Sequence, residues 1–492
     1  MKYFHVAVIG AGVIGSSIAW ELSKYNLDVV VFEKGSDAAV GTSKANSGVV
    51  HSGINSPVSS LKARFCVEGN KMFQQLSDSL GFSLEWVGKY VIAKNDDEAK
   101  ELIKLKKVGI DNGVSGLEIK DEEEVKKKEP NIPCYKALWV PSAGIILPYE
   151  FTIALAENAA INNVNFLLET EVKDIKRNNG LFRIKTNNGE YQSKVLINAA
   201  GVNCRYIVSM LEDPTFNVYP CRGEYLVLDK SYSNLIKSMI YPVPPKKLGV
   251  LGVHITPTIE GNILIGPSAE FIENSDDKRN TKKMMETLLK EAKEITPKLP
   301  KKAVISAYSG IRCKLASPDE GGWADYIVEE SKQIPNMINL LGIESPGLTA
   351  APAIAKEVVS MISKLIDLKL KSDFKTKKFN NKRFIEKSSN EKSELIKKDP
   401  KWGRVVCRCE HITEAEVINA LKNPLKAQTL SSVKYRCRAG MGRCQGGFCT
   451  QHIVRILEED LQIDVNNIKL KSPKSNLFYG RTRKINDDKS RL

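Results

Sequence analysis

The chain has 492 residues, of which 42% are hydrophobic, so it is long enough to bury sizeable cores in two to four domains. Five of its ten cysteines come after residue 400, and this clustering indicates metal ligation in a reducing compartment rather than a secreted disulfide framework. The net charge of +15 raises the question of nucleic-acid binding, which the position of that charge along the chain must decide.

The first predicted elements form a strand–turn–helix–strand unit. Phe4–Ile9 is an apolar run suited to a buried parallel strand, a helical pattern continues through Tyr25, and Asp28–Phe32 predicts a second strand. The glycines inside the run Tyr3–Leu22 argue against a signal peptide or a membrane anchor. No later stretch approaches about eighteen uninterrupted apolar residues, so we expect no transmembrane helix and a soluble, cytoplasmic protein.

A glycine-rich turn joins the first strand to the helix. Gly10, Gly12 and Gly15 have the GxGxxG spacing. One glycine permits the tight turn, one lets the backbone approach a pyrophosphate, and one lets the helix pack against the strand. The helix N-terminus then offers N–H groups to the phosphates, and Glu33 can accept hydrogen bonds from a ribose. This order of elements predicts a dinucleotide site rather than a merely tight turn.

Other segments favour FAD over NAD as the dinucleotide. The sequence contains no second GxGxxG, which disfavours a flavoprotein that is reduced by a bound pyridine nucleotide. Val195–Gly201 reads as another buried strand ending at a glycine, as flavoproteins with two dinucleotide-binding domains have beside the FAD. Thr42–Gly53 is rich in small polar residues and glycine, so it can run close beside a large planar cofactor.

Six segments together resemble the D-amino-acid-oxidase superfamily of FAD enzymes, in content and in order. They are Thr42–Gly53, Ser60–Gly69, Gly144–Ala156, Arg222–Leu228, Gly252–Pro267 and Gly342–Ala355. Within that superfamily they look like the bacterial FAD-dependent glycerol-3-phosphate dehydrogenases of the anaerobic large-subunit type, with L-2-hydroxyglutarate dehydrogenases as near relatives. The resemblance spans about residues 4–370. It implies an α/β fold, in which a glutathione-reductase-like FAD-binding domain is interleaved with an antiparallel β-sheet substrate domain.

The resemblance also implies domain boundaries and FAD contacts. The FAD-binding domain is expected to be discontinuous, over residues 1–85, 145–215 and 305–370, with the substrate domain over residues 86–144 and 216–304. The expected cofactor-binding residues are Gly10, Gly12, Gly15 and Glu33 at the ADP half, Val172 at the adenine, Thr42, Ser43, Ser47 and Gly48 beside the flavin, Ala200 and Gly201 after the strand, and Gly347, Leu348 and Thr349 near the flavin pyrimidine.

Oxidation of a secondary alcohol needs a hydride acceptor, a base for the hydroxyl proton and an anchor for the rest of the substrate. Flavin would be the acceptor. His254 lies in an extended segment that the resemblance places in the substrate sheet, and its neutral imidazole can take a proton near pH 7. The alternative is a sheet histidine with satisfied hydrogen bonds. His51 is expected to line the flavin rather than to transfer a proton.

Two arginines are candidates for the substrate anchor. Arg312 ends the segment Val304–Arg312, where relatives place an arginine that grips the substrate's anion, and Arg222 is the second candidate. A guanidinium suits phosphate and carboxylate equally, so neither residue chooses the substrate. Each arginine could instead form a surface ion pair.

Gly342–Thr349 precedes a helical run, Ala350–Ile366. The N-terminus of such a helix, aimed at the flavin pyrimidine edge, would stabilise negative charge on the reduced ring. An ordinary helix cap is the alternative.

Much of the positive charge lies in a segment that is poor in apolar residues. Lys369–Lys401 contains twelve Lys or Arg and five Asp or Glu, a net charge of 12 − 5 = +7. We interpret residues 371–401 as a solvated basic linker rather than a nucleic-acid surface. Such a linker can still attract an anionic membrane surface or an acidic partner.

The segment after the linker, residues 402–492, carries a cysteine pattern for a cofactor. Four thiolates can hold a [2Fe–2S] cluster or a zinc ion, and the close Cys407-x-Cys409 spacing favours iron and sulfide. Thr413–Glu416 has the form of a capping box that starts a helix, and Gln451–Asp460 has a helical pattern. Both cysteine groups would then lie at helix N-termini, which favour anionic thiolates.

This tail resembles the bacterioferritin-associated-ferredoxin-like [2Fe–2S] domain, which is expected to be small and α-helical. The resemblance places the cluster ligands at Cys407, Cys409, Cys444 and Cys449. Cys437 stands where relatives commonly have threonine, so it is expected to be a bystander, although it could replace Cys444.

The sequence therefore predicts an FAD-dependent dehydrogenase that oxidises glycerol 3-phosphate to dihydroxyacetone phosphate, with His254 as base and Arg312 as phosphate anchor. Electrons would leave for a quinone, a protein acceptor or a partner subunit, with peripheral contact at the inner face of the membrane. An L-2-hydroxyglutarate or other 2-hydroxy-acid dehydrogenase is the alternative within enzymes. A cysteine tail that serves as a docking or redox-sensing module is the alternative from another class.

Overall fold

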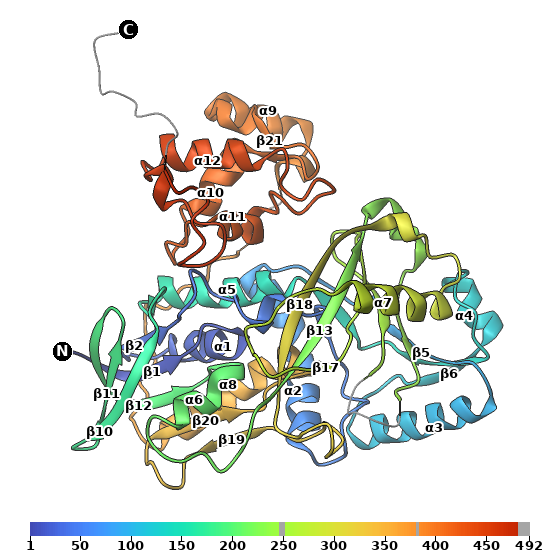
Figure 1. The fold of residues 1–492 in the computed structure, drawn as a ribbon, viewed down its shortest axis with the longest axis horizontal. Helices are drawn as coiled ribbons and strands as arrows, with labels where there is room; N and C mark the ends of the chain where they lie inside the picture. Colours follow the sequence, from blue (N-terminus) through green and yellow to red (C-terminus); the bar gives the residue numbers. More distant parts are fainter. Residues whose placement is uncertain (246–250, 380–382, 481–492) are drawn as a thin grey trace. The chain divides into compact units, whose positions relative to one another are not determined.

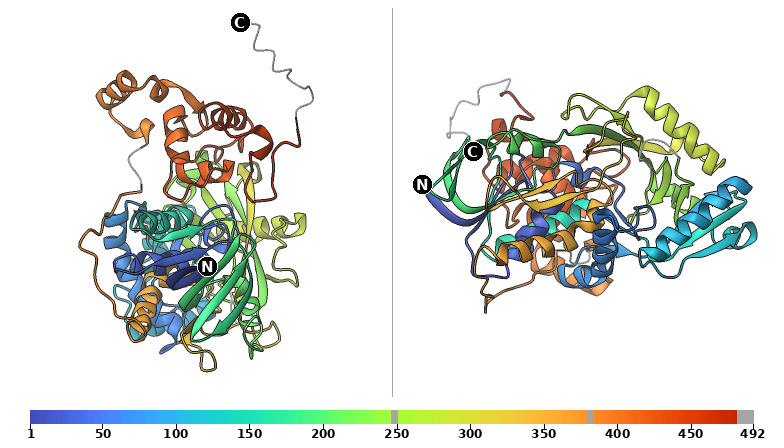
Figure 2. Two further views of the ribbon diagram at one scale, coloured as in Figure 1. Left: turned by 90° about the vertical axis from the view of Figure 1, so that its left-hand side faces the viewer. Right: turned by 90° about the horizontal axis from the view of Figure 1, so that it is seen from below.

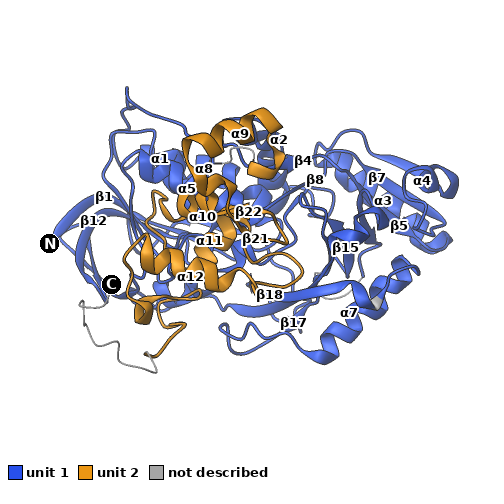
Figure 3. Cartoon of the chain, turned by 90° about the horizontal axis from the view of Figure 1, so that it is seen from above, with its two compact units in different colours: residues 1–381 blue, residues 382–492 orange. Residues whose placement is uncertain are grey.

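The computed structural model describes residues 1–245, 251–379 and 383–480. The chain divides into two compact units, Met1–Asn381 and Lys382–Leu492, which are coloured separately in Figure 3. The division falls inside the segment 371–401 that the sequence predicts as a linker.

The first sheet of unit 1 has a parallel core built from apolar runs. The order in this core is β20-β12-β1-β2-β9, and Val6 lies opposite Val29 on one side and Val195 on the other. The strands are β1 (Lys2–Ile9), β2 (Val29–Phe32), β9 (Asn165–Leu167), β12 (Gly189–Asn198) and β20 (Met337–Leu341). The strands predicted at Phe4–Ile9 and Asp28–Phe32 are confirmed.

An antiparallel extension continues the first sheet beyond β12. Strand β12 begins at Gly189, earlier than the predicted run Val195–Gly201, and it ends at Asn198, before Gly201. It pairs with β11 (Leu181–Thr186). Strand β11 pairs in turn with β10 (Val172–Asn178), and β19 (Ile327–Glu330) pairs antiparallel with β20. Figures 1 and 2 show β10 and β11 beside β1 and β12 at the end of unit 1 that holds the N-terminus.

Helices cover the first sheet. The helix α1 (Val13–Leu22) packs against β1 and β2 and against α5 (Pro148–Ile161) and α8 (Gly347–Ser363), and α2 (Leu61–Leu80) packs against α8. The α1 helix ends before the predicted Tyr25, because the chain turns there towards β2 with the Tyr25 amide bonded to the Leu22 carbonyl.

The second sheet forms the other half of unit 1. Its order is β17-β13-β16-β15-β14-β5-β7-β6, and β18 pairs with β13. The pairs are antiparallel except that of β5 with β14, so the predicted antiparallel sheet contains one parallel pair. The strands are β5 (Lys89–Ala93), β6 (Glu118–Asp121), β7 (Lys136–Val140), β13 (Tyr219–Leu228), β14 (Met239–Pro242), β15 (His254–Pro257), β16 (Ile263–Gly266), β17 (Glu270–Phe271) and β18 (Val304–Lys314).

Alternation along these strands gives the second sheet two different faces. One face is apolar: Ile240, Ile255 and Ile265 are fully buried and belong to the same core as Leu288 of α7 (Lys282–Ile295). The other face carries the polar and aromatic residues of the site. Strand β18 belongs to this sheet, although the predicted boundaries place its residues in the FAD-binding domain.

The remaining elements of unit 1 connect the two sheets or cap their ends. The basic residues after Leu370 are fixed in part, because Asn162 and Asn158 bond to the backbone of Lys375 and Lys377. The connecting elements are η1 (Thr42–Lys44), β3 (Val49–Val50), β4 (Leu84–Glu85), α3 (Asp96–Asp111), α4 (Glu122–Lys128), β8 (Gly144–Ile146), η2 (Gly201–Asn203), α6 (Cys204–Val208), η3 (Lys230–Leu235) and η4 (Lys301–Ala303).

Unit 2 is mostly helical, with its own buried core around Val417, Val433 and Leu457. The predicted capping box is confirmed: Thr413 accepts from the Glu416 amide, and the Glu416 carboxylate accepts from the Thr413 amide. The elements are η5 (Phe384–Glu386), α9 (Ser389–Lys398), η6 (Pro400–Gly403), β21 (Val405–Cys407), β22 (Ile412–Thr413), α10 (Glu414–Leu421), α11 (Leu430–Cys437), α12 (Thr450–Glu459) and η7 (Val465–Asn467). In the described part of the chain, no helix combines the length and apolarity needed to cross a bilayer.

Candidate active site and cluster-binding site

The glycine-rich turn forms a close-packed cradle between β1 and α1. Gly10 has a φ of +105°, which favours glycine, and a Cβ at Gly15 would lie 1.9 Å from the Gly10 carbonyl oxygen. No side chain caps α1 at Gly12, and the Val13 amide donates to Ser43 Oγ at 2.8 Å. The tight turn and the N-terminus of α1 suit a pyrophosphate.

Glu33 follows β2 and lies beside this cradle. Its carboxylate oxygens accept from the amides of Ala11 at 2.9 Å and Gly35 at 2.7 Å, and each oxygen keeps a lone pair for a ribose hydroxyl. The Thr170 amide donates to the Glu33 carbonyl, which brings the start of β10 at Val172 close to Glu33. The donor and acceptor set therefore fits the ADP half of FAD.

The segment after β12 reaches the same cradle. A Cβ at Gly10 would lie 2.6 Å from the Ala199 carbonyl oxygen, and the Ala199 amide donates to Ile9. Ala200 and Gly201 therefore follow directly at the edge of the predicted dinucleotide site.

The small-residue loop joins the two sheets. Thr42 Oγ1 donates to the Ile311 carbonyl of β18 at 2.6 Å, and Ser47 bonds to the Tyr225 side chain of β13. A Cβ at Gly310 would lie 2.1 Å from the Ala45 carbonyl oxygen, so this glycine lets the loop lie directly on the second sheet. Gly48 ends the loop with a φ of +68°.

His51 connects this loop to the start of α8. The His51 amide donates to Thr349 Oγ1 at 2.8 Å, and His51 Nε2 lies 3.5 Å from Ser345 Oγ. Burial lowers the pKa of His51 to about 3, and the neighbouring Lys89 acts in the same direction. The first turn of α8, which begins at Gly347 and Leu348, thus lies beside His51.

A buried ion cluster fixes the segment before α8. Glu344 Oε1 pairs with Lys62 Nζ at 2.9 Å and with Lys314 Nζ at 3.1 Å. Both lysines are at most 3% exposed. These residues come from three distant segments, so no sequence pattern indicates that they meet.

The face of the second sheet that lacks the α7 core carries His254. The pairing of Ile240 with Ile255 places Tyr241 opposite His254, and the two rings stack with centroids 3.9 Å apart and planes 9° apart. Thr256 Oγ1 lies 3.0 Å from His254 Nδ1. Burial lowers the pKa of His254 well below its usual value, and positive charge on neighbouring groups lowers it further.

Lys89 lies on the same face, two strands from His254. It pairs with Met239 of the adjacent strand β14, and its Nζ lies 4.8 Å from the centre of the Tyr241 ring. The side chain is 1% exposed, and burial lowers its pKa to about 8. Lys89 and Tyr241 carry no sequence signal for a site, because only the strand register brings them to His254.

Arg312 lies on this face on the other side of His254. Its Nη2 donates to the Ser268 carbonyl at 3.0 Å, and its Nη1 lies 3.5 Å from Cys221 Sγ. Arg312 also bonds to Tyr225 and acts on the pKa of His254. The structure therefore brings His254 and Arg312 to one sheet face, below the loop that holds His51.

The predicted role of Arg222 as an alternative anchor does not fit the structure. Arg222 lies one residue from Cys221, so alternation points it to the opposite face. Its guanidinium is already paired with three carboxylates, which belong to Glu224, Glu270 and Asp277. An arginine neutralised in this way holds the sheet together and has no charge left for a substrate.

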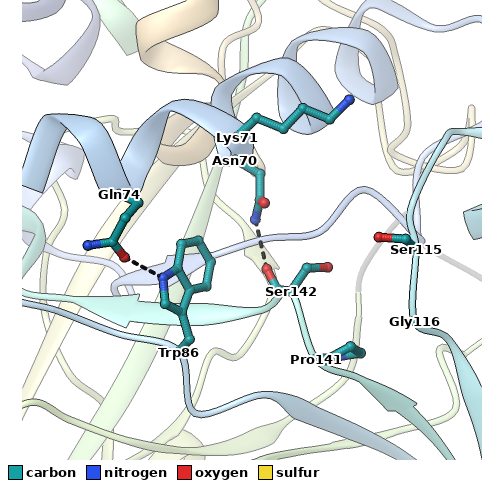
Figure 4. A pocket seen from close by; sticks show the side chains of 8 residues that line it. All are labelled: Asn70, Lys71, Gln74, Trp86, Ser115, Gly116, Pro141 and Ser142. Atoms are coloured by element: carbon teal, nitrogen blue, oxygen red, sulfur yellow. Dashed lines mark hydrogen bonds between the residues drawn. The ribbon is translucent and has the colours of Figure 1, made fainter.

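A surface pocket of about 390 Å³ is lined by residues that include Asn70, Trp86 and Ser142 (Figure 4). Asn70 borders it and donates to the carbonyls of His51 and Ser142, and Trp86 Nε1 donates to Gln74. None of the predicted site residues lines this pocket.

In unit 2 the four predicted ligands meet as two pairs. All four are free thiols: Cys407 is hydrogen-bonded to Cys449, and Cys409 is hydrogen-bonded to Cys444. The bond from Cys449 lowers the pKa of Cys407 to about 6, and backbone amides around Gly440 and Glu410 assist. Amides directed at sulfur in this way favour an anionic group. Cys409 and Cys444 are exposed, whereas Cys407 and Cys449 are buried.

Cys437 stands apart from these pairs. Its Sγ donates to the Val433 carbonyl of its own helix at 3.3 Å, and burial raises its pKa to about 12. Within the described ranges, no three His, Cys, Asp or Glu side chains surround a point that would hold a single metal ion. Two pairs of thiols suit the two irons of a [2Fe–2S] cluster better than one zinc ion.

The family model described as FAD dependent oxidoreductase (DAO) matches residues 5–361. This chain belongs to that family. A second family model, described as BFD-like [2Fe-2S] binding domain, matches residues 405–459. This oxidoreductase therefore has FAD as the cofactor of unit 1 and a [2Fe–2S] cluster as the cofactor of unit 2. The predicted fold class is confirmed.

Two relatives of this oxidoreductase are named for different activities. The oxidoreductase is 41% identical over 483 residues to a glycerol 3-phosphate dehydrogenase from Caloramator mitchellensis, which covers 98% of this chain and 99% of the relative. It is 31% identical over 402 residues to the mitochondrial L-2-hydroxyglutarate dehydrogenase of Arabidopsis thaliana, which covers 72% of this chain and 82% of the relative.

A solved structure supports the same fold. The oxidoreductase resembles the dithionite-reduced L-alpha-glycerophosphate oxidase from Mycoplasma pneumoniae with FAD bound, at a TM-score of 0.71 and 31% identity. The likeness covers 76% of this chain and 98% of the oxidase.

Proposed function

We propose that the chain oxidises sn-glycerol 3-phosphate to dihydroxyacetone phosphate and passes the electrons to a quinone or a protein acceptor. The likeness to a glycerol 3-phosphate dehydrogenase over 98% of this chain carries the proposal, because an alignment of that extent includes both units. Bound FAD supplies a hydride acceptor, and a bound [2Fe–2S] cluster supplies a one-electron carrier.

In this proposal, the residues around the glycine-rich cradle hold FAD. Close packing and the α1 N-terminus favour the pyrophosphate, and Glu33 accepts from the ribose. The remaining contacts are proposed at Gly10, Gly12, Gly15, Thr42, Ser43, Ser47, Gly48, Val172, Ala200, Gly201, Gly347, Leu348 and Thr349.

His254 is proposed as the base that takes the substrate hydroxyl proton at Nε2. The Thr256 hydroxyl can accept a hydrogen bond from a proton-bearing Nδ1, and in that tautomer the lone pair of the ring lies on Nε2. Stacking on Tyr241 keeps the ring in one orientation. Burial and nearby positive charge keep the imidazole neutral, and an anionic substrate offsets that charge and strengthens the base.

Arg312 is proposed as an anchor for the phosphate. Its guanidinium forms no ion pair with an acidic residue in the described part of the chain, unlike that of Arg222. His51 is proposed to line the flavin. The first turn of α8 is proposed to stabilise negative charge at the flavin pyrimidine.

Cys407, Cys409, Cys444 and Cys449 are proposed as the cluster ligands. Exposure of Cys409 and Cys444 gives an acceptor access to one side of the cluster. We place the reaction in the cytoplasm, with peripheral contact at the inner face of the membrane for a quinone-linked partner. The basic residues of the segment 371–401 suit an anionic lipid surface.

An anaerobic absorption spectrum tests the proposal. The purified protein should be yellow, and glycerol 3-phosphate should bleach the flavin band within the turnover time. Bleaching by L-2-hydroxyglutarate but not by glycerol 3-phosphate would replace the substrate. A colourless protein that takes up no FAD on reconstitution would contradict the proposal altogether.

A further inference from the structure

Lys89 is a buried cation to which the proposed function gives no role. Its side chain is 1% exposed, and its Nζ donates a long hydrogen bond of 3.5 Å to Asn55 Oδ1. Burial lowers its pKa to about 8, and the only group in the described ranges that acts against this is the Cys66 thiol, not a carboxylate. A charged ammonium without an anion is costly to bury, so this position is built either for a neutral amine or for an anionic ligand.

The surroundings favour an anionic ligand. Tyr241 lies under the ammonium, with Nζ 4.8 Å from its ring centre, and it is 2% exposed. Its hydroxyl is buried and has no hydrogen-bond partner among the described residues. A buried hydroxyl without a partner is uncommon in folded proteins, and it supplies a donor for an oxygen anion.

This pair of donors belongs to the substrate face of the second sheet. Lys89, Tyr241 and His254 come from three neighbouring strands, β5, β14 and β15, and they point to the same side. Tyr241 stacks on His254, and Lys89 acts on the pKa of His254. A group bound at the ammonium is therefore part of the ligand whose hydroxyl meets His254.

We propose that the Lys89 ammonium, with the Tyr241 hydroxyl, binds the phosphate of the substrate. The inference rests on the proposed function, because it takes glycerol 3-phosphate as the ligand. A phosphate has three terminal oxygens, so it can accept from Lys89 and Tyr241 and still accept from a guanidinium. Lys89 and Tyr241 then supply the anion contacts on the β5 side of His254, while Arg312 adds positive charge from the β18 side.

The decisive experiment compares a charged ligand with its neutral counterpart. Dihydroxyacetone phosphate and dihydroxyacetone are titrated into the oxidised holoenzyme, and binding is followed by the change in the flavin spectrum. Lys89→Met keeps the length of the side chain and removes its charge. We expect this substitution to weaken the binding of dihydroxyacetone phosphate about 100-fold and the binding of dihydroxyacetone less than about threefold.

A matched control removes the same charge elsewhere. Lys128 Nζ lies 4.2 Å from the centre of the Trp139 ring, and Trp139 packs against the core that faces α7. Lys128→Met should leave both affinities unchanged. Lys89→Arg, which keeps the charge, should recover part of the phosphate affinity. Tyr241→Phe should weaken the binding of dihydroxyacetone phosphate about tenfold, as expected for the loss of one hydrogen bond to a charged group.

Three results would overturn the inference. An unchanged phosphate affinity in Lys89→Met excludes a phosphate contact. If Lys89→Met weakens the binding of dihydroxyacetone phosphate and of dihydroxyacetone equally, Lys89 has a structural role. A shift in the flavin midpoint potential with unchanged ligand affinity makes the ammonium a counter-ion for the reduced flavin instead.

Failure of the proposed function gives a different result. The wild-type flavin would then respond to 2-oxoglutarate and not to dihydroxyacetone phosphate. In that case Lys89→Met is titrated with 2-oxoglutarate, and an unchanged affinity would remove Lys89 from the anion site as well.

Discussion

The two cofactor sites are built in opposite ways. In unit 1, the groups around the proposed FAD and substrate positions come from segments between Gly10 and Thr349, which two sheets bring together. In unit 2, the four cysteines lie between Cys407 and Cys449, on turns beside short helices. A dispersed site depends on strand register and close packing, whereas a local site depends on spacing along the chain. The following changes test that difference.

The largest effect is expected where the dispersed site depends on close packing. Gly15→Ala places a Cβ 1.9 Å from the Gly10 carbonyl oxygen, so α1 must move away from β1. We expect a protein with little or no bound FAD and no substrate oxidation, measured by the flavin-to-protein absorbance ratio. Gly41→Ala is the control, because no atom lies within 4 Å of its Cβ. Normal FAD content in Gly15→Ala would show that the cradle tolerates displacement.

The next largest effect is expected at His254, which the strand register places on the substrate face of the second sheet. His254→Gln should slow flavin reduction by glycerol 3-phosphate about 100- to 10,000-fold while the FAD content stays normal. Anaerobic stopped-flow measurement of flavin bleaching gives the rate. His5→Gln is the control, because His5 lies on β1 and bonds to the Asp28 amide. A decrease of less than about tenfold would remove His254 as the base.

Loss of the cluster from unit 2 should leave the flavin site of unit 1 intact. Cys444→Ser removes a proposed ligand, and we expect loss of iron, of acid-labile sulfide and of electron transfer to an acceptor by at least about 10- to 100-fold. Flavin reduction by substrate should persist. Cys437→Ser should keep the cluster, since Cys437 bonds to its own helix. Loss of the cluster in Cys437→Ser instead would exchange the two roles, and unchanged transfer in Cys444→Ser would favour a docking module.

The smallest effect is a pH dependence of phosphate binding in unit 1. Lys89 has a pKa of about 8 in the free protein, and a bound anion raises it, so binding takes up a proton above pH 8. The dissociation constant of dihydroxyacetone phosphate should be level between pH 7 and 8 and rise about tenfold per unit above pH 8. Burial moves the pKa of each neighbouring titratable group away from this range. These neighbours are His51, Cys66, Tyr241 and His254.

Lys89→Arg separates this titration from others. Its guanidinium stays charged throughout, so the rise above pH 8 should disappear, as spectral titration at each pH would show. A rise of the same size in Lys89→Arg would assign the titration to another group.

Local pattern was enough to predict much of the molecule. The apolar run, the GxGxxG turn and Glu33 act within one βαβ unit, so their spacing alone defines a dinucleotide cradle. The cysteines and the Thr413 capping box are equally local. Resemblance supplied the positions of His254 and Arg312, but not the face of the sheet on which each lies.

Only the tertiary structure shows which side chains of the second sheet lie on the same face. Sequence cannot give the register of strands that are separated by long connections, and a shift of one residue reverses every side chain. Register turns Arg222 away into a cluster of carboxylates and brings Lys89 and Tyr241 beside His254. The sequence by itself therefore determined which cofactors this protein carries, while the tertiary structure decided which charges meet at the substrate face.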